Sequence, residues 1–423
     1  MDSKIRVAFI KFGGLSAGGT EKWLQMMAAN LPRNEFEVDY YYCDAAPYCK
    51  SSYKHADTDE NRLKYMNDNN VTLIKFRVGF KDVSKYTHDW TDTDFWQLFD
   101  EKNYDLIQTA KAGPEEYPFY LINKPVVEYI TLGTGVDFGK NIARSIHLSN
   151  WQRLRWFKKG GDIKKSSIIP IPVERPINNE NLRKDLLIPD NAIVMGLHQR
   201  VDNEIYSEVP LNSYRQINSD NKYFIVMGGG DMYKEQAKKL GLKNVLFLKH
   251  SADPEKISKF LNTLDIYAHG RKDGETFGTV LAEAMIHGLP CLSHSSEVAN
   301  AQPETMGPGG FFAKDQNEYT DLLQKLFSDE KLRIETGNSG KKYAEENYLL
   351  DVCLKKLLDI YKYVLNKNKI IPEDKFLFKG SVILKIKRAI LRNIVYRKIK
   401  MLAYEKIFNT KQLIKKYVKP NNS

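Results

Sequence analysis

Short apolar segments recur along the chain, separated by longer polar or amphipathic stretches. In the first part of the chain these segments are rich in β-branched and aromatic residues, as strands are; they are Ile5–Ile10, Phe36–Tyr42, Val71–Phe76, Leu106–Thr109, Val126–Thr131, Ser145–Leu148 and Ile168–Ile171. A second series follows Pro176: Ala192–Leu197, Tyr223–Met227, Val245–Leu248, Ile266–Ala268 and Cys291–Ser293. Strands that alternate with helical stretches predict parallel sheets covered by helices.

The two series of strands predict two domains of the doubly wound α/β class. A chain of 423 residues is longer than one core usually supports. Between Ile168 and Pro176 the prolines are closely spaced, which favours an extended linker between the two domains. We therefore expect Rossmann-like domains over 1–172 and 173–350, a closing helix over 351–370 and a tail over 371–423.

The composition is that of a globular protein, with 42% hydrophobic and 28% charged residues. The sequence contains no long uncharged apolar run, and its N-terminus lacks the cleavage pattern of a signal peptide, so we expect a cytoplasmic protein. The four cysteines form no spacing typical of a zinc site, which fits a reducing compartment.

One stretch combines the features of a phosphate site with two acidic residues. In DIYAHGRKDGETFGTVLAEAMIHGLP, residues 265–290, a strand is followed by a glycine-containing loop and a helix expected from about Phe277 to His287. The first N–H groups of such a helix suit a phosphate. Glu275 and Glu283 lie roughly 12 Å apart along it, a distance comparable to that from a donor sugar to its nucleotide ribose.

This stretch resembles the E-x7-E signature of the retaining GT-B glycosyltransferases of family 4, also called group 1. The resemblance covers most of residues 190–350 and, more loosely, the N-terminal domain. It implies that Glu275 contacts the transferred sugar and that Glu283 contacts the ribose. It also implies that the backbone at Phe277, Gly278 and Thr279 helps bind the diphosphate or the sugar.

A second glycine-rich loop follows the first strand. Gly18 and Gly19 open the helix that comes after it, and the resemblance implies that this loop faces the donor phosphates. The loop lacks the G-x-G-x-x-G spacing, and no acidic residue suited to bind a ribose ends the second predicted strand. These two features disfavour a nicotinamide-dependent enzyme.

The cations expected around the diphosphate depart from the family pattern. The family usually places an arginine and a lysine five residues apart after the first strand of the second domain. Arg200 matches the arginine and would stabilise the departing diphosphate, whereas the lysine position falls on Ile205. Arg271 and Lys272, just before Glu275, are the candidates to replace the missing charge.

Other polar residues are interpreted as structural. His198, His269 and His287 lie near the site in sequence, and we interpret them as packed or hydrogen-bonded residues. The pairs Asp57 with Asp59 and Asp92 with Asp94 imitate a metal-binding D-x-D motif but do not follow apolar strands. We therefore expect turn and capping residues there, and neither a required metal nor a cofactor.

The resemblance implies transfer of a glycosyl group from a nucleoside diphosphate sugar to an acceptor hydroxyl with retention, in polysaccharide or glycolipid synthesis. The alternatives are an inverting transferase, a sugar-nucleotide epimerase, or a non-catalytic protein that binds sugar nucleotides or nucleic acid. The sugar, the base and the acceptor are left open by the sequence.

The C-terminal tail carries the whole net charge of the chain. Residues 371–423 contain 14 Lys and Arg against 3 Asp and Glu, a net charge of +11, which equals that of the full chain. The neutral remainder argues against a nucleic-acid partner. Over Lys379–Val418, apolar residues gather on one side of a helix and basic residues lie largely opposite, although Lys387 and Lys398 interrupt the apolar side. We therefore expect the tail to dock on an anionic membrane that presents a glycan or lipid-linked acceptor.

Overall fold

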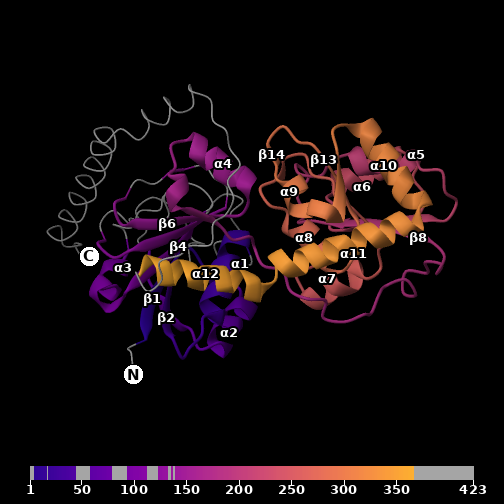
Figure 1. The fold of residues 1–423 in the computed structure, drawn as a ribbon. Helices are drawn as coiled ribbons and strands as arrows, with labels where there is room; N and C mark the ends of the chain where they lie inside the picture. The colour runs from indigo at the N-terminus through magenta and orange to yellow at the C-terminus, as the bar shows by residue number, and fades with distance from the viewer. Residues whose placement is uncertain are drawn as a thin grey trace, which may run out of the picture. The chain divides into compact units, whose positions relative to one another are not determined.

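The computed structural model divides into two compact units (Figure 1). It describes residues 4–16, 18–43, 58–78, 93–111, 122–131, 135–136 and 139–365. One unit, here the N-terminal unit, comprises the described residues up to Ile169 together with those from Leu354 to Leu365. The other, the C-terminal unit, comprises Pro170–Cys353.

The N-terminal unit is built on a parallel sheet of seven strands in the order β3-β2-β1-β4-β5-β6-β7. The strands are β1 (Ile5–Ile10), β2 (Phe36–Tyr42), β3 (Thr72–Lys75), β4 (Leu106–Lys111), β5 (Val126–Ile130), β6 (Ile142–His147) and β7 (Ser166–Ile168). Its helices are α1 (Gly19–Asn30), α2 (Glu60–Asp68), α3 (Phe95–Leu98) and α4 (Asn150–Lys158), with short 3-10 turns at Glu101–Asn103 and Ile163–Lys165. All seven strands overlap predicted segments, although β6 begins three residues earlier than predicted and β7 shares only Ile168 with its segment.

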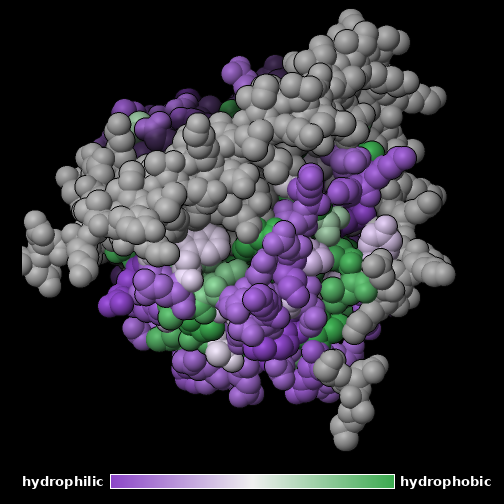
Figure 2. Space-filling model, turned by 90° about the vertical axis from the view of Figure 1, so that its left-hand side faces the viewer, coloured by the Kyte–Doolittle hydropathy of each residue, from purple (hydrophilic) through white to green (hydrophobic). Residues whose placement is uncertain are grey.

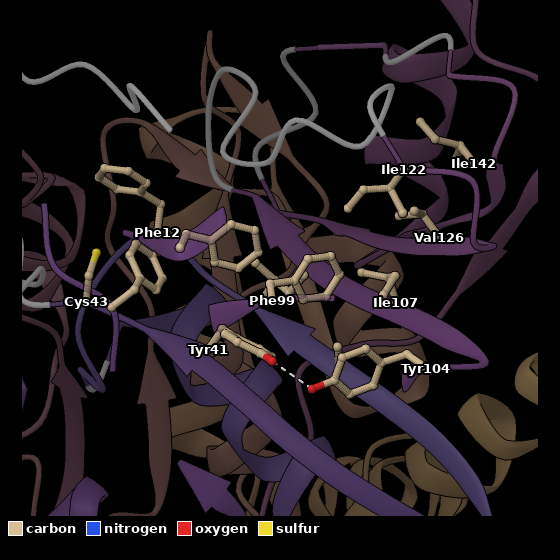
Figure 3. Packing of buried hydrophobic residues seen from close by; sticks show 13 residues of the cluster. Phe12, Tyr41, Cys43, Phe99, Tyr104, Ile107, Ile122, Val126 and Ile142 are labelled. Atoms are coloured by element: carbon tan, nitrogen blue, oxygen red, sulfur yellow. Dashed lines mark hydrogen bonds between the residues drawn. The ribbon is translucent and has the colours of Figure 1, made fainter. Parts of the chain in front are cut away.

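Successive residues of a strand point to opposite faces of the sheet, and both faces of this sheet are covered by packed side chains. On one face Trp23 of α1 stacks on Tyr129 of β5, with ring centroids 3.7 Å apart. On the other face an aromatic cluster around α3 packs on the sheet (Figure 3). There the hydroxyls of Tyr41 and Tyr104 lie 2.7 Å apart, and the Tyr104 hydroxyl donates to Asp39 Oδ2 at 2.6 Å, so both phenols are hydrogen-bonded.

The C-terminal unit repeats this plan with six parallel strands in the order β10-β9-β8-β11-β13-β15. The strands are β8 (Ile193–His198), β9 (Lys222–Met227), β10 (Val245–Leu248), β11 (Ile266–Ala268), β13 (Cys291–His294) and β15 (Gly310–Ala313). A separate pair joins β12 (Gly274–Glu275) to β14 (Ala299–Asn300). The predicted doubly wound α/β class is thus confirmed. The pattern missed β15, which is short and begins with a glycine, and the two-residue strands β12 and β14.

The helices of the C-terminal unit follow its strands in alternation. They are α5 (Val209–Gln216), α6 (Asp231–Lys239), α7 (Pro254–Leu261), α8 (Thr279–Ile286), α9 (Gln302–Met306), a 3-10 turn at Gly307–Gly309, α10 (Gln316–Ser328) and α11 (Glu330–Asn347). A further helix, α12 (Leu350–Val364), begins in this unit and ends in the N-terminal one, where the Tyr361 hydroxyl donates to Gln108 Oε1 at 2.9 Å. Helix α11 ends at Asn347 and α12 begins at Leu350, and the bridge from Leu349 to Val173 lies in the break between them.

Among the coloured residues of the face shown in Figure 2, hydrophilic ones predominate, and hydrophobic residues form small groups between them. Among the helices that the structure describes, none is long and apolar enough to cross a bilayer. The predicted tail over 371–423, including its amphipathic segment, lies outside the described residues.

Candidate functional site

The candidate site lies where the strand order of the C-terminal unit reverses. The chain runs outward from β8 through β9 to β10 and then returns to β11 on the other side of β8. Doubly wound sheets bind ligands beyond the carboxyl ends of the strands at such a point. Here β8 ends at His198, and His269 follows β11 directly.

The loops after these two strands are joined to one another. Tyr206 and Arg271 form an antiparallel bridge, and the Lys272 N–H donates to the Ile205 carbonyl at 2.9 Å. Ile205 is the position at which the family pattern expects a lysine. The fold therefore brings Arg271 and Lys272 beside that position, although 66 or more residues separate them from it in sequence.

The backbone of Glu275 is held by the short strand pair. In β12 and β14, Gly274 lies opposite Ala299 and Glu275 opposite Asn300, and the Ala301 N–H donates to the Glu275 carbonyl at 2.9 Å. Gly274 has a φ of +63°, and a Cβ there would lie 1.8 Å from the Ala299 carbonyl oxygen. A glycine is thus required immediately before the glutamate.

The Glu275 side chain contacts two basic groups through the same oxygen. Oε1 lies 3.3 Å from Nε2 of His269 and 3.5 Å from Nη1 of Arg271. Behind the imidazole, His269 Nδ1 lies 2.8 Å from the Ser293 hydroxyl on β13. The carboxylate is therefore fixed from the side of the sheet, with 15% of its side chain exposed.

Glu283 is held in the same manner by a histidine at the end of the neighbouring strand β8. It lies on α8, and its Oε2 is 3.0 Å from Nε2 of His198. The other ring nitrogen of His198 faces the Tyr267 hydroxyl at 3.2 Å. Burial raises the pKa of Tyr267 well above its usual value, so this hydroxyl keeps its proton. Each glutamate of the motif is thus paired with one buried histidine.

The start of α8 presents backbone N–H groups beside Glu275. Gly278 precedes the helix with a φ of +94° and, being a glycine, has no side chain with which to cap it. The Thr305 hydroxyl donates to the Phe277 carbonyl, which fixes the turn. The predicted positions Phe277, Gly278 and Thr279 therefore form a helix N-terminus suited to an anion. The helix itself begins at Thr279, two residues later than expected, because Gly278 adopts a left-handed conformation.

The two predicted arginines are each held by an aspartate two residues further along the chain. Arg200 Nη2 lies 3.0 Å from Asp202 Oδ2, and Arg271 binds Asp273 through Nε at 2.6 Å and Nη2 at 2.9 Å. Burial would lower the pKa of Arg271, but its hydrogen bond to Asp273 and nearby carboxylates raise it above the usual range. Arg200 is 54% exposed, whereas Arg271 is mostly buried.

The remaining predicted residues lie at the surface or in the other unit. Lys272 is exposed, and its carbonyl accepts from the Ser296 hydroxyl at 2.7 Å. Gly18 and Gly19 are in the N-terminal unit, where Gly18 caps α1 without a side-chain bond. A Cβ on Gly18 would lie 2.5 Å from Glu21 Oε2, whose partner oxygen Oε1 is 3.2 Å from Lys11 Nζ.

Sequence reasoning noticed the site histidines without finding their partners. His198 and His269 are hydrogen-bonded, as predicted, but their partners are the motif glutamates. Ser293 was not singled out at all. The available signal was the position of each residue at or just after the end of a predicted strand. His287, by contrast, lies at the far end of α8 and pairs with Asn262 at 2.8 Å.

Comparison with known sequences matches part of the chain to one family. Residues 178–343 match the family model described as glycosyl transferases group 1. The capsular polysaccharide biosynthesis glycosyltransferase CapM of Staphylococcus aureus is 26% identical over 129 residues, which are 30% of this chain and 32% of CapM. The match therefore spans about a third of that relative's length.

Comparison with solved structures extends the likeness over both units. A glycosyltransferase from Rickettsia africae matches with a TM-score of 0.67 at 13% identity, covering 86% of this chain and 100% of the other. Anabaena HepE in complex with UDP-glucose matches with a TM-score of 0.62 at 15% identity, covering 85% and 100%. These likenesses show that the fold is GT-B, as predicted.

Proposed function

We propose, from a C-terminal unit that matches the group 1 glycosyl transferases, that this protein is a retaining glycosyltransferase that uses a nucleoside diphosphate sugar. One observation carries the proposal. Glu275 and Glu283 lie at the strand-order reversal of the C-terminal unit, each paired with a histidine that ends or follows one of the two central strands. The site thus combines two oriented carboxylates with a helix N-terminus between them.

The two glutamates would bind opposite ends of the donor. Glu275 would accept hydrogen bonds from hydroxyls of the transferred sugar, and Glu283 would accept them from the ribose. The diphosphate would lie at the start of α8, where N–H groups and the helix dipole favour negative charge. The UDP-glucose in the structure of HepE supports a donor of this chemical class.

Catalysis would rest on stabilising the departing diphosphate. The bond between the anomeric carbon and the phosphate oxygen breaks, and the acceptor oxygen bonds to that carbon on the same face. The acceptor's proton passes to the departing phosphate oxygen, so no strong protein base is required. Arg271, the N-terminus of α8 and Arg200 would stabilise the negative charge that develops, which is a preorganised electrostatic effect. We propose that these groups suffice without a metal, so a chelator should leave the rate unchanged.

The acceptor would be a glycan or a lipid-linked glycan at the cytoplasmic face of a membrane. The likeness to CapM supports a role in cell-surface polysaccharide or glycolipid synthesis. The basic tail would hold the enzyme at anionic lipids, because each basic residue near such a surface contributes on the order of 1 kcal/mol. No nucleic-acid partner is proposed, since the rest of the chain is neutral.

The proposed function is tested by donor binding and product analysis. A panel of nucleotide sugars is screened by thermal shift, because a bound donor raises the unfolding temperature. The stabilising donor is then incubated with acceptor glycans, and the anomeric configuration of the product is determined by NMR. A product with the donor's configuration is expected. An inverted product would contradict retention, and the absence of stabilisation by any donor would contradict the proposed function.

A further inference from the structure

A buried chain of hydrogen bonds connects β13 through His269 to Glu275. The Ser293 hydroxyl lies 2.8 Å from His269 Nδ1, and His269 Nε2 lies 3.3 Å from Glu275 Oε1. We infer that His269, supported by Ser293, is a positioning residue that holds Oε1 of Glu275 and presents Oε2 to the donor sugar. This inference rests on the proposed function and deepens it.

The chemistry of the three groups determines where the protons lie. A glutamate carboxylate only accepts hydrogen bonds, so His269 Nε2 must carry a proton in order to bond to it. In the neutral ring Nδ1 is then an acceptor, and the Ser293 hydroxyl donates to it. The carboxylate thus selects the imidazole tautomer, and Ser293 provides the hydrogen bond that the other ring nitrogen requires in that tautomer.

Burial excludes a direct catalytic role for His269 and Ser293. The side chain of His269 is 1% exposed and Ser293 is completely buried. A substrate therefore cannot reach the serine as a nucleophile or the ring as a base, although the order serine, histidine and carboxylate is that of a hydrolytic triad. Glu275 is the member of the chain that is accessible.

The imidazole has little freedom to move. The His269 N–H donates to the Leu292 carbonyl at 2.8 Å, and the buried Tyr319 hydroxyl donates to the His269 carbonyl at 3.2 Å. These bonds fix the backbone from two sides, so the direction of Nε2 is set by the sheet. The held oxygen of Glu275 is consequently placed by rigid elements and not by a loop.

The two contacts of Glu275 leave one oxygen for the substrate. His269 and Arg271 both bind Oε1, and within the described part of the chain Oε2 has no partner. Losing His269 would leave Arg271, whose guanidinium is shared with Asp273, as the group that holds the carboxylate. We expect Glu275 to rotate toward the arginine, and a displacement of about 1 Å at a reacting centre costs on the order of 10²-fold in rate.

His198 provides a contrasting case within the same site. It bonds to Glu283, the glutamate assigned to the ribose, at 3.0 Å. Its loss should therefore weaken donor binding more than it slows the chemical step. His287 lies one turn beyond Glu283 on α8 and pairs with Asn262. It takes no part in the hydrogen bonds that hold Glu275, so it provides a control for the His269 variants.

The test compares His269→Ala with His269→Gln, whose amide nitrogen keeps a donor near the position of Nε2. We expect His269→Ala to lower kcat by on the order of 10²-fold with little change in the donor KM, and His269→Gln to recover most of that loss. His198→Ala should instead raise the donor KM, and His287→Gln should behave as wild type. Thermal unfolding of each variant checks that it is folded. Equal losses in both His269 variants, or a change in KM alone, would overturn the inference.

A second measurement needs no activity. Long-range proton–nitrogen NMR of the full chain labelled with 15N-histidine reports which ring nitrogen carries the proton, with His269→Gln assigning the signal. A proton on Nε2 is expected, and a ring protonated on Nδ1 alone would overturn the inference. If wild type transfers no sugar, the proposed function fails while this measurement still decides the hydrogen-bond chain.

Discussion

Arg271 and Asp273 form a forked ion pair in which Nε lies 2.6 Å from Oδ1 and Nη2 lies 2.9 Å from Oδ2. The remaining nitrogen, Nη1, faces Glu275 Oε1 at 3.5 Å. A single guanidinium is thus shared between an aspartate that anchors it and the glutamate assigned to the sugar. Because the arginine is held before any donor arrives, little reorganisation is needed when charge develops on the diphosphate.

This geometry predicts unequal roles for the two cations that precede Glu275. Arg271→Ala should cost about 2 to 4 kcal/mol in transition-state stabilisation, the usual scale for one preorganised group. Lys272 is exposed, so Lys272→Ala should cost clearly less. Steady-state kinetics on the two variants measures both, with Arg200→Ala alongside. A wild-type kcat/KM in Arg271→Ala would show that Arg271 does not stabilise the diphosphate.

The two motif glutamates should separate in kinetics. Glu275→Gln should nearly abolish transfer, because a neutral amide at the sugar loses the charge and changes the hydrogen bonding. Glu283→Ala should chiefly raise the donor KM, because it removes the carboxylate assigned to the ribose. Both proteins should unfold at temperatures near that of wild type. A Glu275→Gln enzyme with undiminished kcat would refute the site assignment.

Gly274 should tolerate no side chain, whereas Gly241 should tolerate one at moderate cost. Both have φ near +60°, but a Cβ at Gly274 meets the Ala299 carbonyl oxygen at 1.8 Å, and one at Gly241 meets no atom within 4 Å. Gly241→Ala should therefore lower the free energy of unfolding by about 1 kcal/mol, from the left-handed backbone alone. Gly274→Ala should lower it by roughly 3 kcal/mol or more through added overpacking. Urea unfolding compares them, and equal losses would contradict the clash.

His287 should make stability depend on pH. Burial lowers the pKa of His287 to about 4. The unfolded chain, with a pKa of about 6.5, therefore binds a proton first as the pH falls. The contribution of the neutral, buried His287 to the free energy of unfolding is complete above about pH 6.5. It is lost between about pH 6.5 and 4 and amounts to ~3 kcal/mol. Measured by urea unfolding across this range, the free energy of unfolding should fall less steeply with decreasing pH in His287→Gln than in wild type.

The other histidines are present in both proteins of that comparison, so the difference between the two curves isolates His287. Parallel curves for wild type and His287→Gln would show that this ring titrates normally in the folded state. The variant is expected to keep wild-type kinetics at pH 7.5, because the His287 ring bonds to Asn262 and holds neither glutamate.

The basic tail should determine membrane binding and leave the donor site unchanged. Truncation after Pro372 should abolish co-sedimentation with anionic liposomes at low salt, because it removes the tail's excess positive charge. The thermal shift produced by the donor should be retained. Neutral liposomes and high salt serve as controls. A full-length protein that does not sediment with anionic liposomes would exclude the membrane role.

The fold was predictable because its signals are local. A buried parallel strand needs a run of apolar residues, and this need is met within each segment itself, so β1, β2, β10 and β11 match their predicted bounds. The motif around Glu275 was equally readable, because strand, glycine loop and helix follow one another in sequence. The break between α11 and α12 could not be predicted, because both sides of it have helical periodicity and the bridge from Leu349 to Val173 joins distant parts of the chain.

The amino-acid sequence by itself determined the strands other than β12, β14 and β15 of the C-terminal unit, the alternation of strands with helices, and the two glutamates eight residues apart. Tertiary structure decided which groups hold those glutamates. His198 and Glu283 are separated by 85 residues in the chain, and they meet because β8 and β11 are neighbours in the sheet and α8 follows β11. Likewise Arg271 comes to lie beside Ile205 through a bridge between two loops. Contacts of this kind depend on strand order, which hydrophobic periodicity does not encode, because each strand shows only that it is buried and not which strand it pairs with.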